Sequence, residues 1–118
     1  MKKEFLDYLE DILDAMVKAG TFVKDLDYEH FAADTKTNFA VTRALEIIGE
    51  AAKKVPRSVR IRYPEVPWKD MGGMRDKLIH EYWGINLITV WKTVKEEIPK
   101  LRPLFERILQ AAAKKDPT

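Results

Sequence analysis

The chain has 118 residues, which is enough for one domain with its own core and too short for two. Hydrophobic residues make up 46% and charged residues 34%, a balance typical of a folded globular protein rather than a disordered chain. The 21 basic residues nearly cancel the 19 acidic ones, so the net charge of +2 does not by itself indicate a nucleic-acid-binding protein.

The composition also excludes several kinds of site. Cysteine is absent, so the chain can form neither a disulfide nor a thiolate zinc site, and its two widely separated histidines are a poor metal-binding set. No apolar run approaches membrane-spanning length, and residues 1–4 are not followed by the apolar core of a signal peptide. We therefore expect a cytoplasmic protein with no metal, no cofactor and no membrane association.

Apolar residues recur at three- and four-residue spacing at the start of the chain, which predicts a helix over residues 3–19. The residues that carry this pattern are Phe5, Leu6, Leu9, Ile12, Leu13, Met16 and Val17. Gly20 follows directly and is expected to end the helix in the left-handed conformation. Asp27 is expected to cap a short second helix that runs through Phe31 and Ala33.

A longer helix is predicted from residue 36 to residue 54, and Pro56 ends the pattern. Its expected buried stripe consists of Phe39, Ala40, Ala44, Ile47, Ile48, Ala51 and Val55. Gly49 lies within this stripe. Because a glycine inside a helix costs about 1 kcal/mol relative to alanine, Gly49 indicates that another helix approaches closely.

The next region is interrupted by prolines. Residues 57–70 are expected to be irregular with one helical turn, since Pro64 and Pro67 lie within them. The glycine pair at positions 72–73 follows, and a helix that carries residues 75–82 is expected to extend to Trp83.

Asn86 is expected to cap the last helical region, in which Pro99 and Pro103 should bend the helix or divide it in two. Its apolar residues are Val90, Trp91, Val94, Ile98, Leu101, Leu104, Phe105, Ile108 and Leu109. The tail from residue 114 to residue 118 is expected to fray. No strand-like alternation occurs, so the sequence predicts an all-α fold, an antiparallel helical bundle of four main helices with short extra helices.

The octapeptide from Arg75 to Tyr82 is the strongest candidate for a functional site. His80 can exchange protons near neutral pH, Arg75 can stabilise phosphoryl charge, and the Tyr82 hydroxyl can be covalently modified. Metal-independent RNA cleavage would use His80 as general base or general acid and Arg75 to hold the scissile phosphate. That reaction needs the 2′-hydroxyl, so RNA is the expected substrate and DNA is not.

Helical spacing limits how these residues can meet. At 100° per residue, Arg75 and Tyr82 lie within about 20° of each other around the axis, whereas His80 lies about 140° from Arg75. Asp76, four residues before His80, could accept a hydrogen bond from the imidazole. Arg75 and His80 could converge on one phosphate if two copies of the helix face each other across a two-fold axis, or if the helix is distorted after the glycine pair.

The same residues also have structural interpretations. A lone helical histidine is usually structural or exposed, and an Arg-Asp-Lys run is most often a solvated helix face with local ion pairs. Tyr82 and Trp83 are of types that most often pack in cores or interfaces. From spacing alone, the structural interpretation is favoured over catalysis.

The octapeptide resembles the Arg-x-x-x-x-His-x-Tyr signature of the HepT-like toxins within the HEPN superfamily. Flanking segments resemble the same family in its usual order, at residues 43–52, 67–68, 73–75, 90–91 and 98–101. The resemblance covers nearly the entire chain and implies a single HEPN-type helical domain over residues 1–118.

The resemblance further implies a homodimeric endoribonuclease that acts as the toxin of a toxin–antitoxin pair, with Arg75 and His80 carrying cleavage. Its expected partner is a small nucleotidyltransferase antitoxin that transfers AMP from ATP onto the motif tyrosine, here Tyr82. Bulky anionic groups beside Arg75 would occupy the RNA-phosphate site and repel substrate.

Position 76 departs from the family, because it is aspartate where asparagine is common. The charge of Asp76 could raise the basicity of His80 or weaken phosphate binding. Position 86 is asparagine where the family often has aspartate, and helix capping tolerates either.

The densest basic cluster consists of Lys53, Lys54, Arg57, Arg60 and Arg62. It could track an RNA backbone, since phosphate neutralisation supplies most sequence-independent affinity. A solvated helix end with lysines at its favoured C-terminus explains the cluster at least as well.

The remaining residues of note are expected to be structural. A ladder of ion pairs is expected from Arg43, Glu46 and Glu50. The alternative is that Glu46 reaches the site helix and orients Arg75. His30 is expected to have no catalytic role. Packing roles are expected for Trp68, Trp83 and Trp91, with base stacking as an alternative for Trp83.

Two alternatives to a nuclease follow from the same residues. The first is a catalytically inert interaction module that binds a nucleotidyltransferase and presents Tyr82 as its substrate. The second is a helical domain that binds ATP or AMP in the cleft proposed for RNA. The sequence carries no pattern that identifies the RNA or the number of AMP groups attached.

Overall fold

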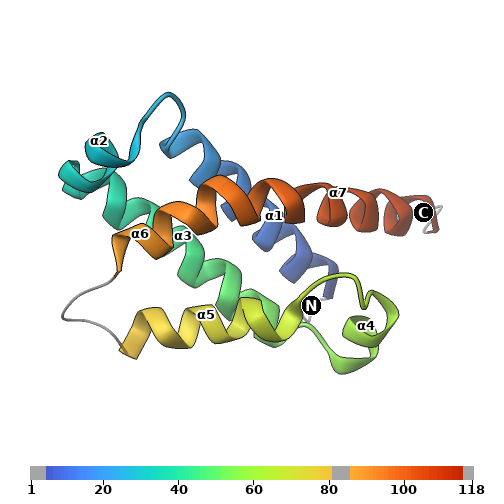
Figure 1. The fold of residues 1–118 in the computed structure, drawn as a ribbon. Helices are drawn as coiled ribbons and strands as arrows, with labels where there is room; N and C mark the ends of the chain where they lie inside the picture. The colour runs from blue at the N-terminus through green and yellow to red at the C-terminus, as the bar shows by residue number, and fades with distance from the viewer. Residues whose placement is uncertain (1–4, 81–85, 116–118) are drawn as a thin grey trace.

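The computed structural model describes residues 5–80 and 86–115, and only the backbone of residues 75, 77–80, 114 and 115 (Figure 1). Within these ranges there are four longer helices, α1 (Phe5–Phe22), α3 (Thr35–Lys54), α5 (Trp68–His80) and α7 (Ile98–Lys115). The shorter elements are α2 (Tyr28–Ala33), α4 (Arg57–Arg62), α6 (Leu87–Lys92) and the π-helix η1 (Thr93–Glu97). The prediction of an all-α bundle with four main helices is confirmed.

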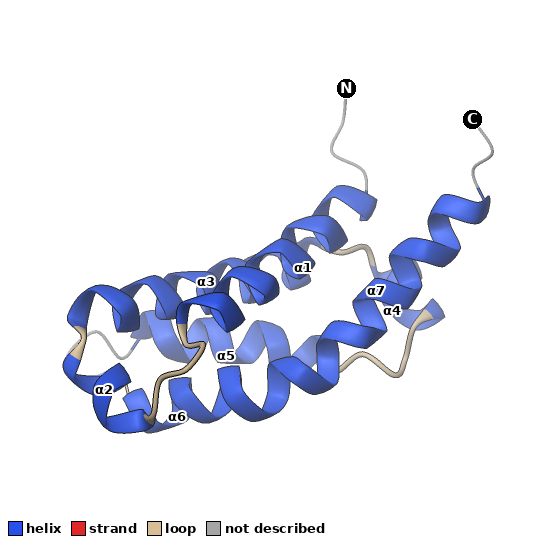
Figure 2. Cartoon of the chain, turned by 90° about the horizontal axis from the view of Figure 1, so that it is seen from above, coloured by secondary structure: helices blue, strands red, loops and turns tan. Residues whose placement is uncertain are grey.

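The helix α3 lies at the centre of the bundle. It packs against α1 on one side and α5 on another, and α1 also packs against α7 (Figures 1 and 2). The most completely buried large side chains are Leu9, Ile12, Met16, Phe31, Val41, Leu45, Val55, Val90 and Phe105. The start of α1 and the end of α7 lie at the end of the bundle that carries α4. In the described part of the chain, no helix combines the length and the apolar composition needed to cross a membrane.

The first helix is longer than its sequence pattern predicts. It continues past Gly20 to Phe22, and Gly20 does not adopt a positive φ. The turn that follows places Asp25 in the left-handed region instead, at φ 64°. An aspartate tolerates this conformation better than most residues because its short polar side chain can hydrogen-bond locally. The predicted cap at Gly20 is therefore wrong.

Aspartates cap the next two helices. Asp27 Oδ1 accepts the backbone N–H of His30 at 2.8 Å, which confirms the predicted start of α2. Asp34 caps α3 by accepting the backbone N–H of Thr37 at 3.1 Å and its hydroxyl at 2.7 Å. The buried side chain of Asn38 donates to the carbonyl of Ala32 at 3.2 Å and so fastens α2 to α3.

The buried face of α3 is rotated from the predicted stripe. Phe39 is 72% exposed rather than buried, and Ala40 and Ile47 are only half-buried. The residues that α3 does bury are Asn38, Val41, Thr42, Ala44, Leu45, Ile48, Gly49, Ala51 and Ala52. Because the Asn38 amide finds carbonyl acceptors on α2, a polar residue occupies the inner face and the hydrophobic pattern alone misplaces its centre.

The helix α5 begins earlier than predicted. Residues 68–70, expected to be irregular, form its first turn, and the Met71 N–H donates to the Pro67 carbonyl at 3.0 Å. Trp68 is 8% exposed; its Nε1 donates to the Tyr63 carbonyl at 3.0 Å, and its ring packs edge-on against Phe105 at 5.7 Å. These contacts fix the start of α5 against α7 and confirm the packing role of Trp68.

The C-terminal helices form one continuous helical run. Asn86 caps α6 as predicted, because its Oδ1 accepts the backbone N–H groups of residues 88 and 89 at 3.1 and 3.2 Å. The prolines do not divide the run in two. Instead, the backbone widens into η1 directly before Pro99, where the Ile98 N–H donates to the Thr93 carbonyl, and Pro103 lies inside α7. In a π-helix each hydrogen bond spans five residues, which makes the backbone wider than in an α-helix. Here the wider segment directly precedes Pro99, which has no N–H to donate.

Candidate functional site

The helix α5 carries the two residues predicted to be catalytic, Arg75 and His80, and the predicted supporting residue, Asp76. The side chains of Arg75 and His80 lie outside the described part of the structure. Tyr82 and Trp83 lie outside the described residues altogether. The site can therefore be located by the backbone of α5 and by the described side chains around it.

The path of α5 is regular from Trp68 to His80, with no 3₁₀ or π turn after the glycine pair. The helix distortion considered as one way to bring Arg75 and His80 together is not found in this segment. Regular α-helical geometry leaves about 140° between these two positions around the axis.

The two glycines of α5 have different surroundings. Gly72 is buried beneath the side chain of Lys53 from α3, and a Cβ at position 72 would lie 3.0 Å from Lys53 Cγ and 3.3 Å from Lys53 Cε. Gly73 is exposed, and a Cβ there would meet nothing within 4 Å. The absence of a side chain at position 72 therefore gives Lys53 its route across α5.

Lys53 reaches across Gly72 to form an ion pair with Asp76. Both side chains are 44% exposed, so the pair contributes no more than about 1 kcal/mol to stability. The effect of this pair is local, because it places a positive charge directly against the Asp76 carboxylate. Lys53 is thus occupied by α5 rather than presented as a free member of the basic cluster.

The five residues of the basic cluster predicted from the sequence do not form one surface. Lys53 pairs with Asp76, and Lys54 lies 4.0 Å from Glu50 one turn earlier on α3. Arg57 and Arg60 belong to α4, where both line a pocket at the start of α5. Arg62 is exposed and does not line that pocket.

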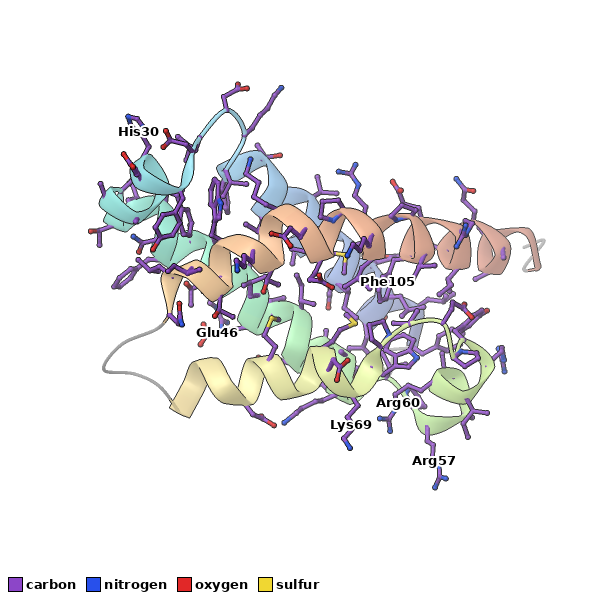
Figure 3. The ribbon with its side chains drawn as sticks, in the orientation of Figure 1. His30, Glu46, Arg57, Arg60, Lys69 and Phe105 are labelled. Carbon is purple, nitrogen blue, oxygen red and sulfur yellow. The ribbon has the colours of Figure 1, made fainter. Side chains whose placement is uncertain are left out.

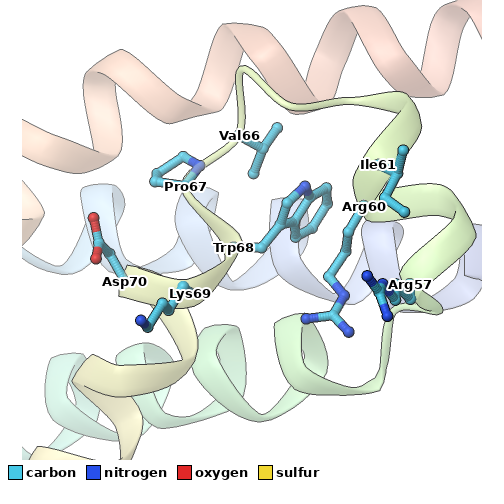
Figure 4. Close-up of a pocket in the computed structure, with 8 residues that line it drawn as sticks. All are labelled: Arg57, Arg60, Ile61, Val66, Pro67, Trp68, Lys69 and Asp70. Carbon is cyan, nitrogen blue, oxygen red and sulfur yellow. The ribbon is translucent and has the colours of Figure 1, made fainter.

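This pocket has a volume of about 420 Å³ and is open to solvent (Figure 4). It is lined by Arg57, Arg60, Ile61, Val66, Pro67, Trp68, Lys69 and Asp70. The sequence interpretation missed Lys69, because this residue is separated from the other basic residues by the two prolines. The fold places the first turn of α5 across this pocket from α4.

The other charged candidates have structural partners. Arg43 lies 3.8 Å from Glu46 on α3, which confirms one step of the predicted ladder, whereas Glu50 pairs with Lys54. Figure 3 labels Glu46 on α3 and His30 on α2. The exposed His30 imidazole lies 2.7 Å from Asp27 Oδ1. Hydrogen bonds from the backbone N–H and then the side chain of His30 hold the pKa of Asp27 below its ordinary value.

The described aromatic residues pack as predicted. Trp91 lies 5.1 Å from the Phe31 ring and 6.2 Å from the Tyr28 ring, and Lys95 Nζ lies 4.9 Å from the centre of its indole. Among the described residues, no group of three or more histidine, aspartate or glutamate side chains is arranged to hold a metal ion.

Comparison with known proteins places the chain among ribonucleases. The family model described as "Ribonuclease HepT-like" matches residues 12–108. A Thermococcus cleftensis protein named "Probable ribonuclease HepT" is 50% identical over 108 residues, which cover 92% of this chain and 98% of that protein. Proteins named as putative RNases from Methanocaldococcus jannaschii and Caldanaerobacter subterraneus are 47% and 46% identical, covering 92% and 87% of this chain and 94% and 92% of theirs. No solved structure gives a significant match.

Proposed function

This chain belongs to the HepT-like ribonuclease family, and on that basis we propose that it is an endoribonuclease whose reacting groups are Arg75 and His80. The observation that carries the proposal is the family match over residues 12–108. The relatives named as ribonucleases align over nearly the whole chain, so the α5 segment falls within the aligned region.

The proposed reaction is attack of the RNA 2′-hydroxyl on its own neighbouring phosphate. His80 removes the hydroxyl proton as general base, or gives a proton to the departing 5′-oxygen as general acid. Arg75 binds the scissile phosphate and stabilises the negative charge that develops on it. Because the nucleophile belongs to the substrate, the chemistry needs no metal-bound water, and DNA lacks the group that attacks.

Two copies of the chain are proposed to share each reaction site. Regular helical geometry separates Arg75 and His80 by about 140° on one α5, so a single helix does not direct both toward one phosphate. In a homodimer with a two-fold axis beside α5, Arg75 of one protomer would approach His80 of its partner. The regular path of α5 supports this arrangement over a locally distorted helix.

We further propose that the protein is a toxin that is neutralised at Tyr82. A small nucleotidyltransferase antitoxin would transfer AMP from ATP: the tyrosine oxygen bonds to the α-phosphorus, its proton is released, and pyrophosphate leaves. The added nucleotide carries negative charge two residues from His80, where it would repel the phosphates of RNA.

Cleavage by purified wild-type protein, His80→Ala and Arg75→Ala in excess chelator tests the nuclease assignment. We expect cleavage by the wild type and its loss in both variants. Equal cleavage by all three proteins would point to a contaminating nuclease and refute the assignment. No cleavage by wild type, with AMP still transferred to Tyr82, would favour the inert interaction module.

Mixing the two single variants tests the shared site. If each site takes Arg75 from one protomer and His80 from the other, a heterodimer of the two variants has one intact site and one doubly defective site. It should regain about half the activity of a wild-type dimer, by this count of intact sites. Demonstrated heterodimers without activity would mean that both groups act within one chain.

A further inference from the structure

The pocket at the start of α5 is lined by three basic side chains, Arg57, Arg60 and Lys69. Six basic side chains in the described ranges form ion pairs with carboxylates, namely Lys18, Arg43, Lys53, Lys54, Lys100 and Arg102. Arg57, Arg60 and Lys69 have no ion-pair partner among the described residues, although all three line one pocket. The pocket also holds one carboxylate, Asp70, which Figure 4 places beside Lys69, at the opposite side of the view from the two arginines.

Arg60 is held in this pocket by packing. Its Nε is buried and has no hydrogen-bond acceptor in the described structure, and Figure 4 shows its aliphatic stem beside the Trp68 ring. Because Trp68 is itself fixed by its hydrogen bond to Tyr63, the guanidinium is placed before any ligand arrives. A preorganised guanidinium loses less entropy on binding an anion than a mobile one does.

The rest of the lining is apolar. Ile61 is 65% exposed, and Val66 and Pro67 form part of the same wall. The volume of about 420 Å³ falls within the range of about 300–1,000 Å³ typical of ligand sites. Two arginines beside an apolar wall suit a nucleotide unit, with its phosphate on the arginines and the sugar or base against the wall. Lys69, on the other side of the pocket, suits a neighbouring phosphate of the same strand.

The pocket is connected to position 80 by one face of α5. Lys69 and His80 are eleven residues apart, which places them within about 20° around the helix and about 16 Å apart along its axis. Asp76 lies on the same face, within about 20° of Lys69, and its charge is countered by Lys53. A polyanion could therefore follow this face from the pocket to position 80 without meeting an unneutralised carboxylate at position 76.

We infer that Arg57, Arg60 and Lys69 form a second phosphate-binding site, which holds an RNA strand by a nucleotide remote from the one that is cleaved. The strand runs along the α5 face that Lys69 shares with His80. The link to cleavage rests on the proposed nuclease function; the phosphate site itself does not. Lys53 lies outside the pocket lining, and its contribution is to neutralise Asp76 on the face that the strand follows.

The test is the salt dependence of binding of a fluorescently labelled single-stranded polyuridine to the His80→Ala protein, which leaves the strand uncut. Each lost phosphate contact should reduce the magnitude of the negative slope of log affinity against log salt by about 0.7 and weaken binding about fivefold at 0.1 M salt. Arg57→Gln with Lys69→Gln should therefore reduce this magnitude by about 1.4. Arg60→Met should lower it by about 0.7, with folding checked by thermal unfolding.

The matched control is Lys24→Gln with Lys36→Gln, which removes the same charge from the end of the bundle that carries α2. The slope of this control should equal that of the His80→Ala protein within experimental error. Equal slopes for the two double variants would overturn the pocket assignment. Displacement of the strand by uridine monophosphate, at a concentration comparable to that of the strand, would also overturn the pocket assignment. The pocket would then be a site for free nucleotides. If the pocket variants showed the reduced salt dependence but the wild-type protein cleaved no RNA, the phosphate site would stand and the proposed nuclease function would be rejected.

Discussion

The glycine pair of α5 offers a direct test of the contact that places Lys53 beside the site helix. Both glycines lie inside an α-helix at negative φ, so alanine is compatible with the backbone at either position. Alanine gains about 1 kcal/mol over glycine in a helix interior. A Cβ at position 73 would meet no atom within 4 Å, so Gly73→Ala should raise the free energy of unfolding by this full amount.

Gly72→Ala should stabilise the protein much less than Gly73→Ala does. The new Cβ would lie 3.0 Å from Lys53 Cγ, so the flexible lysine stem must shift and its ion pair with Asp76 is disturbed. Loss of a half-exposed ion pair costs up to about 1 kcal/mol, which cancels most of the helical gain. We therefore expect Gly73→Ala to exceed Gly72→Ala in free energy of unfolding by about 1 kcal/mol.

Urea unfolding at one fixed protein concentration measures this difference, since a dimer would make stability depend on concentration. In a Lys53→Ala background the two alanine substitutions should become equal, because the obstructing stem is gone. Equal gains in the wild-type background would refute the placement of Lys53 across Gly72.

Three further predictions concern the framework around the site. Phe39→Ser should change the free energy of unfolding by less than about 0.5 kcal/mol, whereas Phe31→Ala should lower it by about 3–5 kcal/mol; comparable losses in urea unfolding would contradict the exposed position of Phe39. The side-chain and backbone hydrogen bonds from Thr37 hold the pKa of Asp34 below its ordinary value. This capping stability is therefore present above the ordinary carboxyl pKa and lost as pH falls through the lowered one. Asp34→Ala should destabilise at neutral pH by an amount that shrinks in acid, and thermal unfolding with a difference independent of pH would contradict the cap. Trp68→Phe removes the hydrogen bond to the Tyr63 carbonyl and should cost about 1–3 kcal/mol in denaturant unfolding; an unchanged midpoint would show that this bond does not hold the start of α5.

Local chemistry determined which parts of the fold could be predicted from the sequence. The caps at Asp27 and Asn86 were predictable because a short polar side chain before a helical pattern accepts nearby backbone N–H groups. Gly20 and Phe39 were mispredicted because tertiary packing, rather than local preference, decides where α1 ends and which face of α3 is inward.

The site shows the same division between local and long-range information. The placement of Arg75 and His80 on one helix follows from periodicity and family resemblance. The pairing of Lys53 with Asp76 joins residues 23 positions apart, and it depends on how α3 packs against α5. Lys69 likewise joins the arginines of α4 only through the turn between them, which no local spacing encodes.

In the proposed reaction, His80 drives cleavage of RNA through the 2′-hydroxyl of the substrate. The most direct test compares wild-type and His80→Ala proteins on an RNA strand and on the same sequence in 2′-deoxy form, with excess chelator. We expect that only the wild type cuts, that only the RNA is cut, and that the products carry a 2′,3′-cyclic phosphate and a 5′-hydroxyl. Cleavage of the 2′-deoxy strand, or undiminished cleavage of RNA by His80→Ala, would contradict it.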